Sequence, residues 1–270
     1  MFLKTVNLWE TVPGLCKETP TLDIYVPEHQ TSDIAVVILP GGGYGMRAEH
    51  EGKGYAEFLN EQGIAAFVCQ YRVNPHLFPL PLMDARRAVQ YVRHYRDTYG
   101  ICKDKVYIMG SSAGGHLAAH YSNYYHCKEV RELFPESKKV AACLLGYPVI
   151  TADPNYCHRG SIEKLAGYFP IKKEDMPKFS CEYQVTENTP PTFIWHTAED
   201  AAVPVQNSLF YANALSKCCV PFEMHIYPYG CHGRSTADMQ SCKEIEPGME
   251  YLHDWINAAV KWLKAAFKMP

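Results

Sequence analysis

The chain has 270 residues, of which 47% are hydrophobic and 20% charged, and its formal net charge at neutral pH is -3. This is the composition of an ordinary globular protein that is long enough for one sizeable core. A slightly negative chain with scattered basic residues gives no reason to expect nucleic acid or an anionic membrane surface as a partner.

The amino-terminal segment, MFLKTVNLWETVPG, lacks the long apolar core and the small-residue cleavage site of a signal peptide. No stretch of about 18 apolar residues predicts a transmembrane helix. The eleven cysteines are odd in number and scattered along the chain, which fits reduced thiols better than a disulfide framework. We therefore expect a cytoplasmic protein with no membrane partner.

Apolar runs rich in β-branched residues alternate with amphipathic stretches. The predicted order is strand 21–26, strand 35–40, helix 54–63, strand 65–71, helix 83–100, strand 106–110, helix 114–125, strand 142–148, strand 191–196, helix 205–217, strand 222–228 and helix 248–268. Continuous apolar runs suit parallel strands that are buried on both faces. The alternation predicts one α/β domain over residues 1–270, with a mostly parallel, doubly wound sheet and helices on both faces.

Residues 151–189 interrupt this alternation. The segment has mixed polarity and contains three prolines, and it is too long for an ordinary connection. We expect an insertion over the carboxyl edge of the sheet that shapes the substrate pocket, with a short helix at residues 161–166.

A G-x-S-x-G motif stands between the predicted strand 106–110 and the helix that follows it. Its central residue is Ser112, between Gly110 and Gly114. This strand–turn–helix context is typical of a nucleophile elbow, in which the serine adopts a strained backbone conformation. The alternative is an ordinary glycine-rich turn. In the elbow interpretation, Ala113 donates its backbone N–H to an oxyanion at the amino end of a helix.

A nucleophilic serine needs a base, and the base needs an acid that orients it. Asp200 follows the strand 191–196, with Glu199 as the rival carboxylate and helix capping as the structural alternative. His232 follows the strand 222–228 on a loop flanked by glycines. The order Ser112, Asp200, His232 is the chain order of an α/β hydrolase.

The other histidines in this half of the chain are expected to serve packing. His196 and His225 fall within predicted strands, and His253 falls within the last predicted helix.

Three glycines follow the early strand 35–40. Such a run lets backbone N–H groups approach a substrate oxygen, and we expect Gly42 and Gly43 to be the donors, with a flexible turn as the alternative. Tyr44, beside them, and Trp195, at the end of a strand, are candidates for stacking on a sugar ring; core packing is the alternative for both.

His116 and His120 have the i, i+4 spacing that suits a metal. Because no third ligand is evident, we expect them to be structural. The predicted chemistry needs neither a metal nor a cofactor.

At this point the sequence resembles a known group, the α/β-hydrolase esterases related to carbohydrate acetyl esterases (xylan acetylesterases), with kinship to hormone-sensitive-lipase-like esterases and prolyl-oligopeptidase-type domains. The matching pieces are PGGGYGMRAEHEG, GIAAFVCQYRV, PLPLMDARRAVQYVR, VYIMGSSAGGHLAAH, TPPTFIWHTAEDAAVPVQNSLFYANAL and GCHGRS. The resemblance implies the triad Ser112, Asp200 and His232, and it implies that Glu51 and Asp84 are framework positions near the site.

The sequence therefore predicts a serine esterase that hydrolyses short-chain esters, acetyl esters above all, of sugars or oligosaccharides, with a small-molecule ester as its partner. Two alternatives stay open. One is a peptidase of the prolyl-oligopeptidase type, although the insertion is too short for the large extra domain that such enzymes carry. The other is a hydrolase-fold binding protein without turnover. The oligomeric state is also open, with a homodimer among the options.

Overall fold

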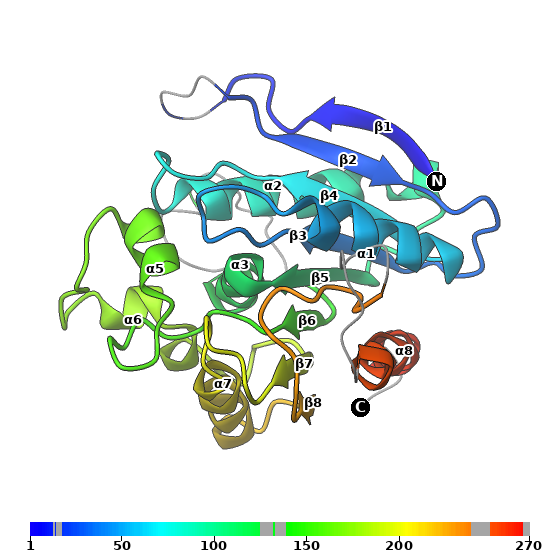
Figure 1. Ribbon diagram of the computed structural model, residues 1–270. Coiled ribbons are helices and arrows are strands. Elements are labelled where there is room, and N and C mark those ends of the chain that lie inside the picture. Colours follow the sequence, from blue (N-terminus) through cyan, green and yellow to red (C-terminus); the bar gives the residue numbers. More distant parts are fainter. Residues whose placement is uncertain (13, 15–17, 125–131, 133–138, 239–248, 267–270) are drawn as a thin grey trace.

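The computed structural model describes residues 1–12, 14, 18–124, 132, 139–238 and 249–266 (Figure 1). The described elements are, in chain order, β1 (Phe2–Asn7), β2 (Thr21–Tyr25), β3 (Ala35–Leu39), α1 (Glu49–Glu61), β4 (Ala65–Gln70), α2 (Leu80–His94), η1 (Arg96–Tyr99), β5 (Val106–Ser111), α3 (Ser112–Tyr124), β6 (Cys143–Gly146), α5 (Arg159–Ala166), α6 (Met176–Phe179), η2 (Cys181–Tyr183), β7 (Thr192–Thr197), α7 (Gln206–Lys217), β8 (Phe222–Tyr227) and α8 (Met249–Ala266).

The strands form one sheet of eight in the order β1-β2-β4-β3-β5-β6-β7-β8. The pairs β1–β2 and β2–β4 are antiparallel, and every other pair is parallel. Because the strands from β3 to β8 run in the same direction, their carboxyl ends meet at one edge of the sheet. Loops that follow β3, β5, β7 and β8 are therefore brought together, and these loops carry the predicted site residues.

Helices cover both faces of the sheet (Figure 1). One face packs against α2, α3 and α7, and the other packs against α1 and α8. The central strand β3 is buried along its whole length, which explains why its sequence, AVVIL, is apolar without alternation. Burying each such side chain contributes roughly 1.5–3 kcal/mol. This architecture confirms the predicted mostly parallel, doubly wound sheet.

The structure differs from the sequence prediction in one strand and at several element ends: the helix predicted at 83–100 is α2 followed by η1, and the strand predicted at 142–148 is the shorter β6. The strand β1 was not predicted, because its residues are almost all exposed and only pairing with β2 makes it a strand. Helix α1 begins at Glu49 rather than at residue 54, and its first turn carries Glu49 and Glu51, which suit the positive end of a helix dipole. The predicted ends of the helices at residues 125 and 267–268 lie outside the described residues.

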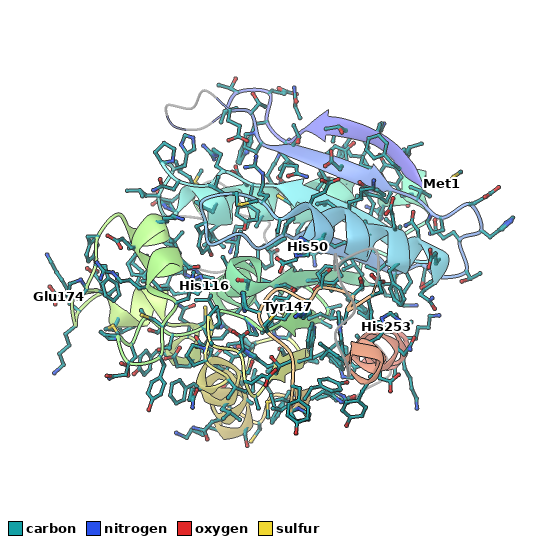
Figure 2. All side chains as sticks on the ribbon, viewed as in Figure 1. Met1, His50, His116, Tyr147, Glu174 and His253 are labelled. Carbon is teal, nitrogen blue, oxygen red and sulfur yellow. The ribbon has the colours of Figure 1, made fainter. Side chains whose placement is uncertain are left out.

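The segment 151–189 forms α5, α6 and η2 at one end of the sheet, and Glu174 marks its outer tip (Figures 1 and 2). The short helix predicted at residues 161–166 is α5, which begins slightly earlier, at Arg159. Within the described part of the chain, no helix combines the length and the apolarity that a membrane span needs.

Candidate active site

The predicted nucleophile elbow lies where β5 passes directly into α3. Ser112 has a φ of 53°, in the left-handed region that residues with a side chain rarely adopt. The glycines around it are needed for space: a Cβ on Gly110 would lie 2.2 Å from the carbonyl oxygen of Gly114, and a Cβ on Gly114 would lie 2.0 Å from the carbonyl oxygen of Leu39. The sequence motif therefore has the local geometry that was expected of it.

A chain of hydrogen bonds joins the three predicted residues. His232 Nε2 lies 2.8 Å from Ser112 Oγ, and His232 Nδ1 lies 2.6 Å from Asp200 Oδ2. Ser112 is 6% exposed and the side chain of His232 is 22% exposed, so the pair is sheltered but open to a small molecule. The order and spacing of these groups fit a serine whose proton can pass to an imidazole.

Asp200 is held in place by more than His232. Its Oδ1 accepts hydrogen bonds from the backbone N–H groups of Ala202 and Val203, at 3.0 and 2.9 Å. His196 Nε2 lies 3.3 Å from Asp200 Oδ2 and 2.9 Å from the carbonyl oxygen of Val203. Burial by itself would raise the pKa of Asp200, but the hydrogen bonds from His196 and His232 outweigh it and hold that pKa well below its usual range.

The rival carboxylate points elsewhere. Glu199 Oε1 accepts a hydrogen bond of 2.7 Å from the backbone N–H of Gly230. It therefore supports the loop that leads to His232, and it makes no hydrogen bond to the imidazole.

The glycine loop after β3 lies against the elbow. A Cβ on Gly41 would stand 2.9 Å from the Cβ of Ser112, so only glycine allows this approach. Gly42 and Gly43 have φ values of 117° and 64°. Among the described residues, no group accepts a hydrogen bond from the N–H of either Gly42 or Gly43. Together with Ala113, the second residue of α3, they are donors that a substrate oxygen can use.

These features agree with what comparison with known proteins finds. The family model of BD-FAE matches residues 22–215. The chain belongs to the BD-FAE family.

Three relatives of this BD-FAE chain are informative. The endo-1,4-beta-xylanase B of Butyrivibrio fibrisolvens is 37% identical over 227 residues, which are 81% of this chain and 35% of that protein. The acetylxylan esterase of Xylanibacter ruminicola is 34% identical over 217 residues, which are 77% of this chain and 42% of that protein. The solved structure of an acetyl ester-xyloside bifunctional hydrolase from Caldicellulosiruptor lactoaceticus has a TM-score of 0.86 and 34% identity, covering 98% of this chain and 97% of that chain.

The chain thus spans well under half the length of the two curated relatives. The predicted α/β-hydrolase fold and the predicted resemblance to acetyl esterases are confirmed. The expected class, a carboxylic ester hydrolase, agrees with the names of these relatives.

A buried network behind the BD-FAE site was not predicted in detail. Glu51, which the resemblance implied as a framework position, accepts hydrogen bonds from the Gly41 N–H at 2.7 Å and from the Tyr147 hydroxyl at 2.8 Å. Tyr147 lies in the middle of the molecule (Figure 2), and its ring centroid is 5.0 Å from that of His232. Its hydroxyl also accepts a hydrogen bond from the Ser235 N–H. The only sequence signal for this tyrosine was its position in the predicted buried strand 142–148, which in the structure ends one residue before it.

The insertion faces the glycine loop. A Cβ on Gly43 would stand 3.7 Å from Ser161 Oγ and 3.8 Å from His158 Cε1. His158 Nδ1 in turn lies 2.7 Å from Ser161 Oγ. Sequence analysis did not single out either residue, because nothing local distinguishes them from a helix start.

The two aromatic candidates for sugar stacking require a correction. Tyr44 and Trp195 are each 1% exposed, so neither ring presents a face to the cleft. Trp195 stacks on Trp255 in the core at a centroid distance of 4.5 Å. The Tyr44 hydroxyl lies 2.9 Å from Nδ1 of His116. Core packing, the alternative interpretation, describes both rings.

The histidines of the core behave differently from one another. His116 Nε2 lies 3.0 Å from the carbonyl oxygen of Phe179, and burial lowers the pKa of His116 to about 4. His120 stacks on Phe78 at 5.3 Å, and burial lowers its pKa well below the usual value. Both are neutral packing residues, whereas His196, also expected to serve packing, contacts the acid of the site.

Proposed function

We propose that this chain is a serine esterase that removes short acyl groups, acetyl above all, from sugars or oligosaccharides. The observation that carries the proposal is the continuous hydrogen-bonded chain from Ser112 through His232 to Asp200, at 2.8 and 2.6 Å. The names of the acetylxylan esterase and of the acetyl ester-xyloside hydrolase support the choice of substrate.

The first half of the proposed reaction forms an acyl-enzyme. His232 Nε2 accepts the proton of Ser112 Oγ as the oxygen attacks the ester carbonyl. The negative charge that develops on the carbonyl oxygen is stabilised by the N–H groups of Ala113, Gly42 and Gly43. His232 then gives its proton to the departing alcohol, and the bond between the carbonyl carbon and the alcohol oxygen breaks.

The second half releases the acid. Water loses a proton to His232 and attacks the acyl carbon, and the same N–H groups stabilise the second oxyanion. When this intermediate collapses, the bond between the acyl carbon and Ser112 Oγ breaks, and His232 returns its proton to Oγ. Asp200 holds Nδ1–H of His232 throughout, and its lowered pKa keeps it ionised opposite the imidazolium. No metal or cofactor is needed in this sequence of steps.

The insertion supports a small substrate. It places the partly exposed His158 and the buried Ser161 opposite the glycine loop, and it offers no long apolar segment there for a fatty chain. We therefore propose that residues 151–189 limit the acyl group and help to hold the alcohol. The cytoplasmic location and the oligomeric state stay predictions.

The test combines a nitrophenyl ester series from acetyl to octanoyl with acetylated xylo-oligosaccharides. We expect kcat/KM to be highest for acetyl and to fall steeply by butyryl, and we expect acetate to be released from the sugars. A preference for octanoyl would contradict the proposal. Cleavage of prolyl peptide amides without deacetylation would favour the peptidase alternative.

The matched variants are Ser112→Ala and Ser111→Ala. Ser112→Ala is expected to lower kcat by about 10^4-fold or more with the fold intact. Ser111 Oγ instead bonds the Tyr55 hydroxyl at 2.7 Å, so its loss is expected to cost only about 1 kcal/mol of stability. A fluorophosphonate probe that fails to label the parent protein would favour the binding-protein alternative.

A further inference from the structure

His158 has one ring nitrogen fixed and the other free. It directly precedes α5, and its Nδ1 is held 2.7 Å from the hydroxyl of Ser161, which is completely buried. Among the described residues, no group makes a hydrogen bond with Nε2, and this nitrogen is not one of the buried polar atoms that lack a partner. The ring therefore presents Nε2 to the solvent side.

The His158 ring lies close to the glycine loop. Its Cε1, the carbon bonded to Nε2, is 3.8 Å from the position of a Cβ on Gly43. His232 and Asp200 are near enough for their charges to act on His158. His158 thus lies beside the glycines of the proposed oxyanion hole and within electrostatic range of His232.

The electrostatics keep this imidazole neutral. Burial lowers the pKa of His158, the charge of His232 when it is protonated and the charge of Lys164 lower it further, and Asp200 acts in the opposite direction. A neutral imidazole can donate or accept a hydrogen bond at Nε2, and it does not oppose the positive charge that His232 acquires during the reaction.

We propose that Nε2 of His158 hydrogen-bonds a hydroxyl group on the alcohol half of the ester, which makes His158 a substrate-binding residue that selects sugar esters over simple esters. Ser161 is then a positioning residue, because it acts only through the His158 ring. The inference rests on the proposed function and names the group that recognises its substrate.

The acetyl group of the ester has no free polar atom to which His158 could make a hydrogen bond. The carbonyl oxygen of an acetyl ester is taken by the oxyanion donors, and the methyl group has no polar atom. The alcohol half lies beside His232, because His232 must deliver its proton to the departing oxygen. A free imidazole nitrogen near His232 is therefore matched by a hydroxyl of the departing sugar.

The experiment compares two acetates with the same enzyme variants. We expect His158→Ala to lower kcat/KM on acetylated xylo-oligosaccharides about tenfold or more, since one hydrogen bond to the substrate is lost. On nitrophenyl acetate, which has no hydroxyl, kcat/KM should change less than threefold. Ser161→Ala should also lower kcat/KM on the oligosaccharides relative to kcat/KM on nitrophenyl acetate, but by a smaller factor. His29→Ala, an exposed residue before β3 at the opposite edge of the sheet, should leave both values unchanged.

A deoxy substrate makes the test specific to the hydrogen bond. Acetylated xylosides that lack one hydroxyl at a time are assayed with the parent protein and with His158→Ala. For one of these deoxy sugars, kcat/KM of the parent protein should be about tenfold lower than for the complete sugar. For His158→Ala the same deletion should not change kcat/KM, which is the signature of two partners in one contact.

The outcomes separate the two hypotheses. If the parent protein releases no acetate from any sugar, the proposed function fails and this inference fails with it. If the parent protein deacetylates sugars but His158→Ala lowers kcat/KM equally on both substrates, or on neither, the proposed esterase function stands and the role of His158 is overturned. The role would also be overturned if His158→Ala lowered kcat/KM tenfold relative to the parent protein on every deoxy sugar, because no single hydroxyl would then be the partner of His158.

Discussion

Two regions of the sheet each bury an aspartate, and their partners differ. Asp84, from α2, faces Arg72 just after β4, with Nε and Nη2 of Arg72 each 2.8 Å from a carboxylate oxygen and both side chains 0% exposed. Trp9 Nε1 donates to the same carboxylate. Asp200, after β7, faces the imidazoles of His232 and His196 instead.

The comparison shows how a buried carboxylate becomes structural or reactive. A guanidinium keeps its charge at every accessible pH, so Arg72 is a permanent cation that holds the Asp84 carboxylate and the backbone around it. An imidazole can change its charge near neutral pH, and the second nitrogen of His232 lies 2.8 Å from Oγ of Ser112, the proposed nucleophile. The carboxylate is the same in both places, and the difference lies in the partner and in what that partner touches next.

The largest effect is expected at Asp200. Asp200→Asn should lower kcat by about 10^3 to 10^4-fold, because the amide favours the wrong tautomer of His232. The melting temperature should change little. Glu199→Gln is the matched control and should cost far less, and a reversal of the two effects in a kcat measurement would move the acid to Glu199.

Asp84 should show the opposite profile. Asp84→Asn leaves the buried Arg72 without its counter-charge, so we expect a loss of about 3–5 kcal/mol in the free energy of unfolding, measured in urea. The fraction that stays folded should keep its kcat. Asp33→Asn, which breaks an exposed pair with Lys105, should cost less than about 1 kcal/mol. A selective loss of kcat in Asp84→Asn would erase the distinction between the two regions.

His196 tests how much of the site depends on the second imidazole. His196→Gln removes a donor to Asp200, which should raise the pKa of that carboxyl and lower kcat about tenfold with KM unchanged. His225→Gln, on the neighbouring strand and paired with Glu223, should be close to neutral. If kcat is unchanged in His196→Gln, His196 serves only packing, as the sequence predicted.

The smallest effect concerns a third carboxylate that has no strong partner. Burial raises the pKa of Glu182 to about 7, with the Thr151 hydroxyl acting against it, and Oε2 of Glu182 has no hydrogen-bond partner. The native state therefore binds a proton that the unfolded chain has released, so stability falls as the pH rises from about 4 to 7.

Glu182→Gln should remove that dependence. We expect the variant to be about 1 kcal/mol more stable than the parent at pH 8, where the buried charge is fully formed, and equal to it near pH 4. Thermal melts across this range measure the difference. A constant gap at every pH would mean that the carboxylate of Glu182 is solvated.

The features that could be predicted from the sequence are the local ones. A buried strand such as 35–39 is an apolar run, and the G-x-S-x-G motif around Ser112 spans only two residues on either side, although its close contacts with Leu39 and Gly41 come from elsewhere in the chain. The order of serine, acid and histidine follows from the order of the strands. These features could be predicted because their causes lie in short stretches of chain.

The remaining features depend on contacts between distant residues. Glu51 and Tyr147 are hydrogen-bonded although they are 96 positions apart in the sequence, and no motif near either residue predicts this contact. Trp195 and Tyr44 stand beside predicted site residues, but the direction of a side chain is decided by packing against the rest of the core. His158 was not noticed because only the folded insertion brings it to the glycine loop.

The hydrogen bonds of Tyr147 have a mechanical consequence. Through Glu51 its hydroxyl is tied to Gly41, and through the Ser235 N–H it is tied to the loop that carries His232. The glycine loop and the loop that carries His232 are therefore joined through one buried hydroxyl, and we expect them to open together. Amide hydrogen exchange in the two loops should proceed through one shared opening event, and heat should inactivate the enzyme at the temperature where that single unit releases.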